Sequence, residues 1–284
     1  MVRSAVFLFV LVLISCVVSS AASAQFVDAI KDVVEPDGST GKVDWTTGVV
    51  TATGMGAPPS QPATPAQTRA MAERDAQVVA YRNLLEAVKS VQVDTSTTME
   101  KIIVTNDVIK AQVNGIIQGA MIMDKKYMAD GSVEVTVGMR LTGALAEAVL
   151  PKTAPAAPAA SVATSASVTT GQVYTGLIID ARGRGVRPAM VPKILSEDGT
   201  EIYGPAYINR ELAVREGMAV YMKDLAVAQA NDRVKDKPLV AMAVKVNGDA
   251  RVDIVISNAD ASAIQGTAAN LSVLEKCKVI ILVD

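Results

Sequence analysis

The residues with the greatest potential for chemistry lie in one loop of the C-terminal half, and they are Asp180, Arg182, Arg184 and Arg187. Glycines alternate with the first arginines, and glycine-containing loops at the ends of strands often bind anions. The loop therefore predicts a ligand site for an anion or for peptidoglycan. The alternative interpretation is a solvated loop whose arginines pair with nearby carboxylates, because the spacing matches no phosphate-loop consensus.

The thiol of Cys277 is the second group with potential chemistry. Lys276 and Lys278 flank it, and positive charge nearby favours the reactive thiolate. The apolar run that follows equally favours a small buried residue at this position. A third interpretation is dimerisation through a disulfide in an oxidising compartment.

Paired carboxylates could support acid–base catalysis, and Asp180, Glu197 and Asp198 are the candidates. Asp198 precedes Gly199, which is typical of a turn. The polar segment 258–260 is explained by the capping of a helix. We therefore predict no catalytic, cofactor-binding or metal-binding residues, no cofactor, and no enzymatic activity.

The absence of histidine from all 284 residues supports this interpretation. It excludes histidine-based triads, histidine metal ligands and imidazole pH switches. Of the two cysteines, Cys16 and Cys277, only Cys277 remains if the first 24 residues are removed. A lone thiol forms neither an intrachain disulfide nor a cysteine zinc site. The 27 basic and 29 acidic residues nearly cancel, so the charge predicts no nucleic acid as a partner.

The first 24 residues have the pattern of a secretory signal. Arg3 supplies a positive start, and an unbroken apolar run of ten residues follows from Ala5 to Ile14. A spanning anchor needs roughly 20 apolar residues, so this run is too short to stay in a bilayer. An Ala-Ser-Ala triplet then places small residues at the scissile bond, which predicts cleavage between Ala24 and Gln25.

A second route of processing is open. The sequence Leu-Ile-Ser-Cys ending at Cys16 resembles the lipobox at which bacterial lipoproteins are cleaved and acylated on cysteine. On that route Cys16 carries a lipid, although Val17 and Val18 continue the apolar run beyond it. Both routes predict export, either to the periplasm or, with the lipid, to the periplasmic face of the outer membrane. The only predicted membrane contact is this lipid anchor.

The segment 151–170 divides the rest of the chain. It consists mainly of Pro, Ala, Ser and Thr and contains no large apolar residue except valine. Such a composition cannot build a core and predicts an extended linker. We expect a signal peptide at 1–24, a first domain at 25–150, the linker at 151–170 and a second domain at 171–284.

The first domain alternates between strand and helix patterns. The long helix should bury the face that carries Met71, Val78, Tyr81, Leu85 and Val88, because their spacing is helical. The order of elements predicts an α+β fold with helices packed on one face of a small antiparallel sheet. We expect a strand at 42–53, helices at 65–90 and 106–115, and strands at 118–128 and 132–141 around a turn at Asp130-Gly131.

The second domain is also expected to be a small α+β domain. Its final run, 279–283, is apolar on both faces, which predicts an interior, buried strand. Asn258 is a good N-cap for a helix that runs toward Ala269. We also expect a strand at 173–180, a hairpin at 193–203, short helices at 210–216 and 224–231, and strands at 239–246 and 252–256.

Three segments of the first domain carry a family resemblance. They are RAMAERDAQVVAYRNLLEAVKSVQVD (69–94), VNGIIQGAMI (113–122) and DGSVEVTVGMRL (130–141). Residues 42–141 resemble the envelope lipoprotein family called lipoprotein-20 and the related N-terminal domain of flagellar assembly protein T. The second domain resembles a companion domain of envelope proteins, of unknown activity. The resemblance implies an exported protein near the outer membrane and supplies no catalytic residues.

These observations lead to two hypotheses about function. The first is a non-enzymatic structural or assembly component at the outer membrane or flagellar basal body. Its partners would be envelope or flagellar proteins, or further copies of the chain in a homo-oligomer. The alternative is a ligand-binding or cell-wall-acting module in the second domain, for which we expect a pocket near Asp180 to Arg187.

Overall fold

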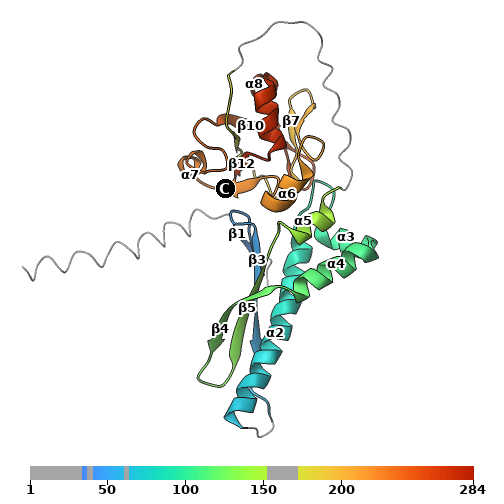
Figure 1. The fold of residues 1–284 in the computed structure, drawn as a ribbon, viewed down its shortest axis with the longest axis vertical. Coiled ribbons are helices and arrows are strands. Elements are labelled where there is room, and N and C mark those ends of the chain that lie inside the picture. Colours follow the sequence, from blue (N-terminus) through green and yellow to red (C-terminus); the bar gives the residue numbers. More distant parts are fainter. Residues whose placement is uncertain (1–33, 37–40, 61–63, 152–171) are drawn as a thin grey trace, which may run out of the picture. The chain divides into compact units, whose positions relative to one another are not determined.

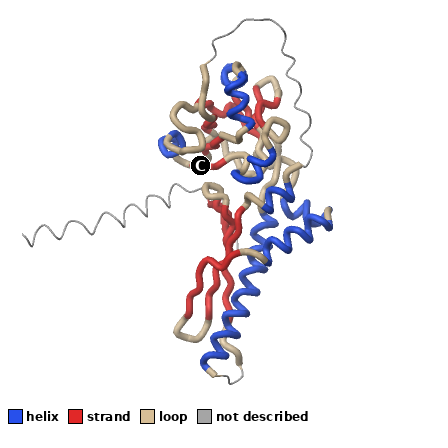
Figure 2. The backbone as a smooth tube through the Cα atoms, in the orientation of Figure 1, coloured by secondary structure: helices blue, strands red, loops and turns tan. Residues whose placement is uncertain are grey.

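The computed structural model describes residues 34–36, 41–60, 64–151 and 172–284 (Figure 1). The predicted signal peptide, its cleavage site at Ala24 and Gln25, and Cys16 lie outside these residues, as does the linker after Pro151. All of the described residues belong to one compact unit. Two separate sheets lie within this unit, and helices accompany both (Figure 2). The prediction of an α+β fold is confirmed.

The first sheet is antiparallel throughout, and its strand order is β1-β2-β3-β5-β4. One long helix, α2 (Pro65–Ser90), packs along one face of it (Figure 1). This arrangement confirms the predicted helices on one face of a small sheet. The strands are β1 (Val34–Pro36), β2 (Gly41–Asp44), β3 (Val49–Gly56), β4 (Met121–Tyr127) and β5 (Val133–Arg140).

Helix α2 has the predicted bounds, because strong signals mark its start. Pro65 occupies the first turn, and Thr64 and Gln67 form a reciprocal capping box. The predicted buried face is wrong in its N-terminal half, although Val88 is buried and Tyr81 and Leu85 pack partly buried against the core. Met71 and Val78 are 55% and 53% exposed, and the helix instead turns a stripe of alanines toward the sheet. The buried residues of α2 are Ala72, Ala76, Ala80, Leu84, Ala87 and Val88.

The alanine stripe is explained by two glycines of strand β3. A Cβ atom added to Gly54 would overlap the backbone of Ala76 and Ala80, and one added to Gly56 would overlap the backbone of Ala72. Backbone of the strand therefore lies directly against backbone of the helix, and only small side chains fit between them. Periodicity of large apolar residues could not reveal this contact, because the contact excludes them.

The predicted strand at 42–53 is a hairpin. The Asp44 carboxylate accepts hydrogen bonds from the backbone N–H groups of Thr46 and Thr47, at 2.9 and 3.1 Å. Gly48 has a φ of +67°, a conformation that glycine adopts without strain. These residues reverse the chain between β2 and β3, and the strand continues through Gly54 to Gly56, where the sequence predicted a break.

The predicted second helix is confirmed as α4 (Asp107–Gln118), and a short helix that was not predicted, α3 (Met99–Thr105), precedes it. Asn106 separates them, and its side chain accepts hydrogen bonds from the N–H groups of Val108 and Ile109, as predicted for an N-cap. Strand β5 confirms the predicted alternation, because Val133, Val135, Val137, Met139 and Leu141 are all buried. The turn before it contains Gly131 with a φ of +86°.

The second sheet has seven strands in the order β8-β7-β11-β10-β6-β12-β9. It is mixed: β7 and β8 form the predicted hairpin, β10 and β11 are antiparallel, and the remaining pairs are parallel. The strands are β6 (Leu177–Asp180), β7 (Ile194–Ser196), β8 (Glu201–Tyr203), β9 (Val220–Met222), β10 (Leu239–Asn247), β11 (Asp253–Ile256) and β12 (Val279–Leu282).

Strand β12 is interior, as predicted from its apolar sequence. It pairs in parallel with β6 on one side and with β9 on the other, and all four of its residues are buried. The helices around the sheet are short. They are α6 (Arg210–Glu216), α7 (Leu225–Gln229), α8 (Asn258–Gln265) and α9 (Ala268–Glu275). A further short helix, α5 (Ala144–Val149), lies between α4 and α6.

The predicted helix from Asn258 to Ala269 needs two corrections. The N-cap is Ser257, whose hydroxyl accepts a hydrogen bond from the Asp260 N–H at 3.0 Å. Gly266 then ends the helix, and Thr267 caps a second one, α9. A Ser-Asn pair offers two adjacent capping side chains, so the sequence alone could not choose between them.

Candidate functional site

The loop Asp180–Arg187 begins at the carboxyl end of β6, and its first charged residues pair with each other. Arg182 donates from Nε to Asp180 Oδ1 at 2.9 Å and from a terminal nitrogen to Oδ2 at 2.5 Å. Asp180 is 8% exposed, and the Arg182 guanidinium lowers the pKa of its carboxyl group. A bidentate pair of this kind needs no ligand to neutralise it.

The other two arginines of the loop are exposed and do not join this pair. The Arg184 carbonyl accepts a hydrogen bond from the Arg251 side chain, and the Arg187 N–H donates to the Arg251 carbonyl at 2.9 Å. Two hollows of the surface, an apolar pocket and a shallow groove, are described below. None of Asp180, Arg182, Arg184 and Arg187 lines either of them. An anion or peptidoglycan site in this loop stays a prediction.

The Cys277 thiol is completely buried and unbonded to another cysteine. Burial raises its pKa, because an apolar environment disfavours the thiolate. The flanking lysines do not offset this effect. The surroundings are therefore those of a packed side chain.

Of the remaining acidic candidates, Glu197 has a hydrogen-bond partner and Asp198 lies in a turn. Glu197 Oε2 accepts a hydrogen bond from the Asn258 N–H at 3.2 Å, and Asp198 lies beside Gly199, which has a φ of +82°. Across the described parts of the chain, no three Cys, Asp or Glu side chains are grouped in a way that could hold a metal ion.

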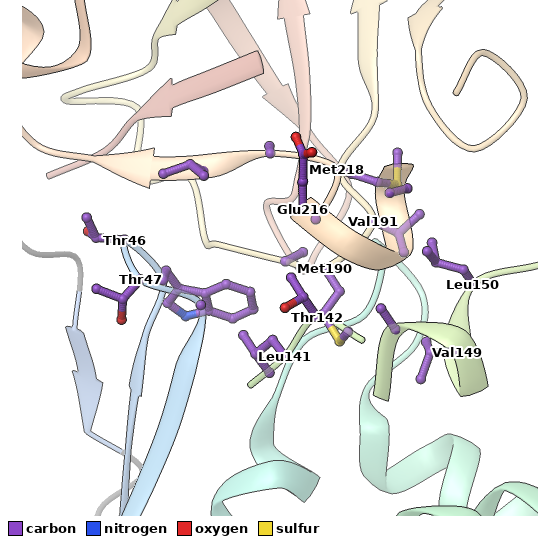
Figure 3. A pocket seen from close by; sticks show the side chains of 18 residues that line it. Thr46, Thr47, Leu141, Thr142, Val149, Leu150, Met190, Val191, Glu216 and Met218 are labelled. Atoms are coloured by element: carbon purple, nitrogen blue, oxygen red, sulfur yellow. The ribbon is translucent and has the colours of Figure 1, made fainter. Parts of the chain in front are cut away.

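An apolar pocket lies where the β2–β3 turn, helix α5 and the segment from α6 to β9 meet (Figure 3). Its void, counted with the open mouth, is about 620 Å³. The few polar groups that line it come from Thr46, Thr47, Thr142 and Glu216. Its apolar walls include Leu141, Val149, Leu150, Met190, Val191 and Met218 (Figure 3).

Direct contacts between the two sheets frame this pocket. The Trp45 ring meets the Tyr221 ring edge to face, with centroids 5.7 Å apart. The Tyr221 hydroxyl donates to the Ala189 carbonyl and accepts from the Ala189 N–H, both at 3.0 Å. Arg210 reaches Glu147 of α5 at 2.8 Å. These contacts surround the pocket. Its lining lacks the several polar groups that converge on a ligand in a typical active site.

Strand β4 ends the order of the first sheet, and every one of its residues is exposed. Its apolar side chains are unusually open to water: Met121 is 68% exposed, Met123 57% and Tyr127 50%. A long edge strand presents a row of unpaired backbone N–H and C=O groups that another chain can pair with. The sequence contained the signal, an apolar run followed by Asp-Lys-Lys, but it could not show that the strand is an edge.

A shallow groove lies on the exposed flank of α2, and all of its lining residues belong to that helix. It is lined by one helical stripe, namely Ala70, Glu73, Arg74, Gln77, Val78 and Tyr81. Glu73 bonds to Lys125 and Tyr127, and the Tyr81 hydroxyl donates to the Ala120 carbonyl at 3.3 Å. These contacts place Glu73 and Tyr81 on the side of α2 toward the β4 segment.

Part of the chain is similar to a known family of protein domains. Residues 176–284 match a family described as Treponema pallidum Tp0624, second domain. The match covers the second sheet and its helices, from just before β6 to the end of the chain. None of the curated proteins matches this chain. In the described residues, no helix combines the length and the apolar character needed to cross a membrane.

Proposed function

We propose that the chain is a non-enzymatic, exported envelope protein that serves as a structural or assembly component at the outer membrane or flagellar basal body. The observation that supports this most is strand β4, an edge strand with exposed methionines and tyrosine. Exposed apolar side chains on an unpaired edge are typical of a surface that another protein covers. The resemblance of residues 42–141 to lipoprotein-20 and flagellar assembly protein T points to the same class.

Cell fractionation tests the proposal. Spheroplasting and density-gradient separation of the envelope should place the protein with the outer membrane or with purified basal bodies, and mass spectrometry should identify either Gln25 or an acylated Cys16 as its N-terminus. A soluble monomer that is absent from both fractions contradicts the proposal.

The apolar pocket favours a second candidate function, the binding of a small apolar ligand that involves the C-terminal half. Its lining is mostly aliphatic, and its contacts are already formed without a ligand. Native mass spectrometry of protein purified from the envelope tests this candidate. An added mass that disappears in a variant with Ala213→Trp, which narrows the pocket, supports ligand binding, and an unmodified mass contradicts it.

A further inference from the structure

The apolar pocket between the β2–β3 turn, α5 and the α6–β9 segment restricts the chemistry of a ligand. We propose that this pocket binds the end of a straight aliphatic chain that carries an uncharged polar group, as a long-chain alcohol does. The proposal rests on the second candidate function above, the binding of a small apolar ligand, and names the ligand class. The size of the cavity, its walls and its charge support it.

The cavity is narrow. Its interior volume is about 80 Å³, although the void counted with the open mouth is about 620 Å³. An engineered protein cavity that binds benzene measures about 150 Å³. The smaller interior of this pocket excludes a six-membered ring, whereas a single row of methylene groups can enter from the mouth. The volume therefore favours a straight chain over a cyclic ligand.

The walls suit such a chain. Leu141 and Val149 supply aliphatic surface, and Met190 and Met218 supply thioether side chains (Figure 3). Methionine is unbranched and has three rotatable bonds, so it adjusts to an irregular shape. Trp45 also lines the pocket, and it is held edge to face against the Tyr221 ring. One wall is therefore fixed, while the methionines can adapt to the chain.

The charge of the lining excludes an anionic ligand. Among the lining residues, all of them in the described part of the chain, Glu216 is the only ionisable one. A carboxylate or phosphate that entered the pocket would lose its hydration without gaining a cation, which is unfavourable. Glu216 already pairs with Arg215 at 2.8 Å, so the pocket does not require a cationic ligand either. The lining matches an uncharged polar end.

One hydroxyl group of the lining is available to that end. The Thr46 hydroxyl donates to the Tyr221 carbonyl at 2.9 Å. The Thr47 hydroxyl donates to the Asp44 carboxylate at 2.7 Å. The Thr142 hydroxyl has no hydrogen-bond partner within the part of the chain that the structure describes. A hydroxyl both donates and accepts, so Thr142 can bond to an alcohol in either direction.

Titration of the whole purified protein, followed by the fluorescence of Trp45, tests this proposal. Trp45 lines the pocket and is the only tryptophan of the chain. Three probes with equal numbers of carbon atoms separate shape from charge, namely 1-octanol, cyclooctanol and octanoate. At neutral pH we expect saturable binding of 1-octanol. Cyclooctanol and octanoate should each bind about tenfold more weakly or not at all, because of the ring and the charge.

A pair of variants places the bound ligand in the pocket. Thr142→Lys adds a cation to the lining, and it should reverse the preference between 1-octanol and octanoate. Thr136→Lys is the matched control, because it makes the same change on β5 outside the pocket. It should leave both affinities unchanged. The comparison of the three probes on the wild type needs neither variant.

Tight binding of cyclooctanol, or octanoate binding as tight as that of 1-octanol, overturns the proposal and leaves the broader candidate of a small apolar ligand standing. Absence of binding by all three probes overturns both. Equal effects of Thr142→Lys and Thr136→Lys would place the alcohol outside the pocket and also overturn the proposal. Cell fractionation reports separately on the envelope role, which none of these outcomes affects.

Discussion

Glu73 of helix α2 and Lys125 of strand β4 form an ion pair with a nitrogen–oxygen distance of 2.5 Å, 52 positions apart in the sequence. The pair ties the edge strand to the helix that packs along the sheet. Tyr127 donates a further hydrogen bond to the same carboxylate at 3.1 Å. This carboxylate is therefore a direct link between β4 and α2.

The Glu73→Gln variant should be slightly less stable than the wild type at neutral pH, by about 1 kcal/mol or less, because the pair is partly exposed. Lys125 and Tyr127 lower the pKa of Glu73 below its ordinary value of 4.5. A lowered folded-state pKa gives stability that is present above pH 4.5 and is lost as the pH falls through the folded value.

Urea unfolding at pH 7 and pH 3 measures this effect. The difference between the wild type and Glu73→Gln should shrink at pH 3. Glu86→Gln serves as the control, since its partner Lys89 belongs to the same helix and does not involve β4. A difference that is equal at both pH values would contradict the assigned role of Glu73.

The close contact between β3 and α2 predicts a strong effect of adding one methyl group. Gly54→Ala should destabilise the protein by about 3 kcal/mol or more, since the new Cβ would overlap helix backbone, which cannot move aside as a side chain can. Gly115→Ala, in α4, has open space around it and should stabilise by up to about 1 kcal/mol. Thermal unfolding of both variants tests the contact, and similar midpoints would refute it.

The contact between the two sheets can be monitored by the fluorescence of Trp45, the only tryptophan of the chain, which packs against Tyr221. Tyr221→Phe removes a buried hydroxyl that bonds to both backbone groups of Ala189, and it should cost about 1–3 kcal/mol. Tyr207→Phe, at a half-buried position, should stay within about 0.5 kcal/mol of the wild type. Urea unfolding monitored by tryptophan fluorescence compares them, and equal losses would be inconsistent with the Ala189 contacts.

The thiol of Cys277 should be unreactive in the folded protein. It is fully buried, and the raised pKa keeps it protonated at pH values near neutrality. Iodoacetamide labelling followed by peptide mass spectrometry should detect modification only after unfolding in guanidinium. Rapid labelling of the native protein would revive the interpretation of Cys277 as a reactive or dimer-forming cysteine.

Local signals in the sequence predicted the elements well where a cap, a turn or an alternation specified them. Thr64 and Pro65 fixed the start of α2, and the alternation from Val133 to Leu141 identified a half-buried strand. The N-terminal half of the buried face of α2 was mispredicted at Met71 and Val78, because small residues select a buried face by allowing backbone contact, which hydrophobicity does not register. Gly54 and Gly56 were interpreted as a break in the strand, because hydrophobicity does not register that they let strand backbone contact helix backbone.

The surfaces were harder to predict than the elements. The sequence drew attention to Asp180 and Arg182, and the structure pairs these two with each other. The exposed edge and its link to α2 depend on strand order and on contacts between residues about 50 positions apart, such as Glu73 with Lys125 and Tyr127. A single sequence carries no direct signal for strand order, so neither feature could be derived from it.

Hydrogen–deuterium exchange of β4 tests the central claim most directly. In the isolated mature chain at low concentration, the outward-facing amides of Met121–Tyr127 should exchange much faster than those of the interior strand β5. Protection of β4 as strong as that of β5 would contradict an open, exposed edge strand.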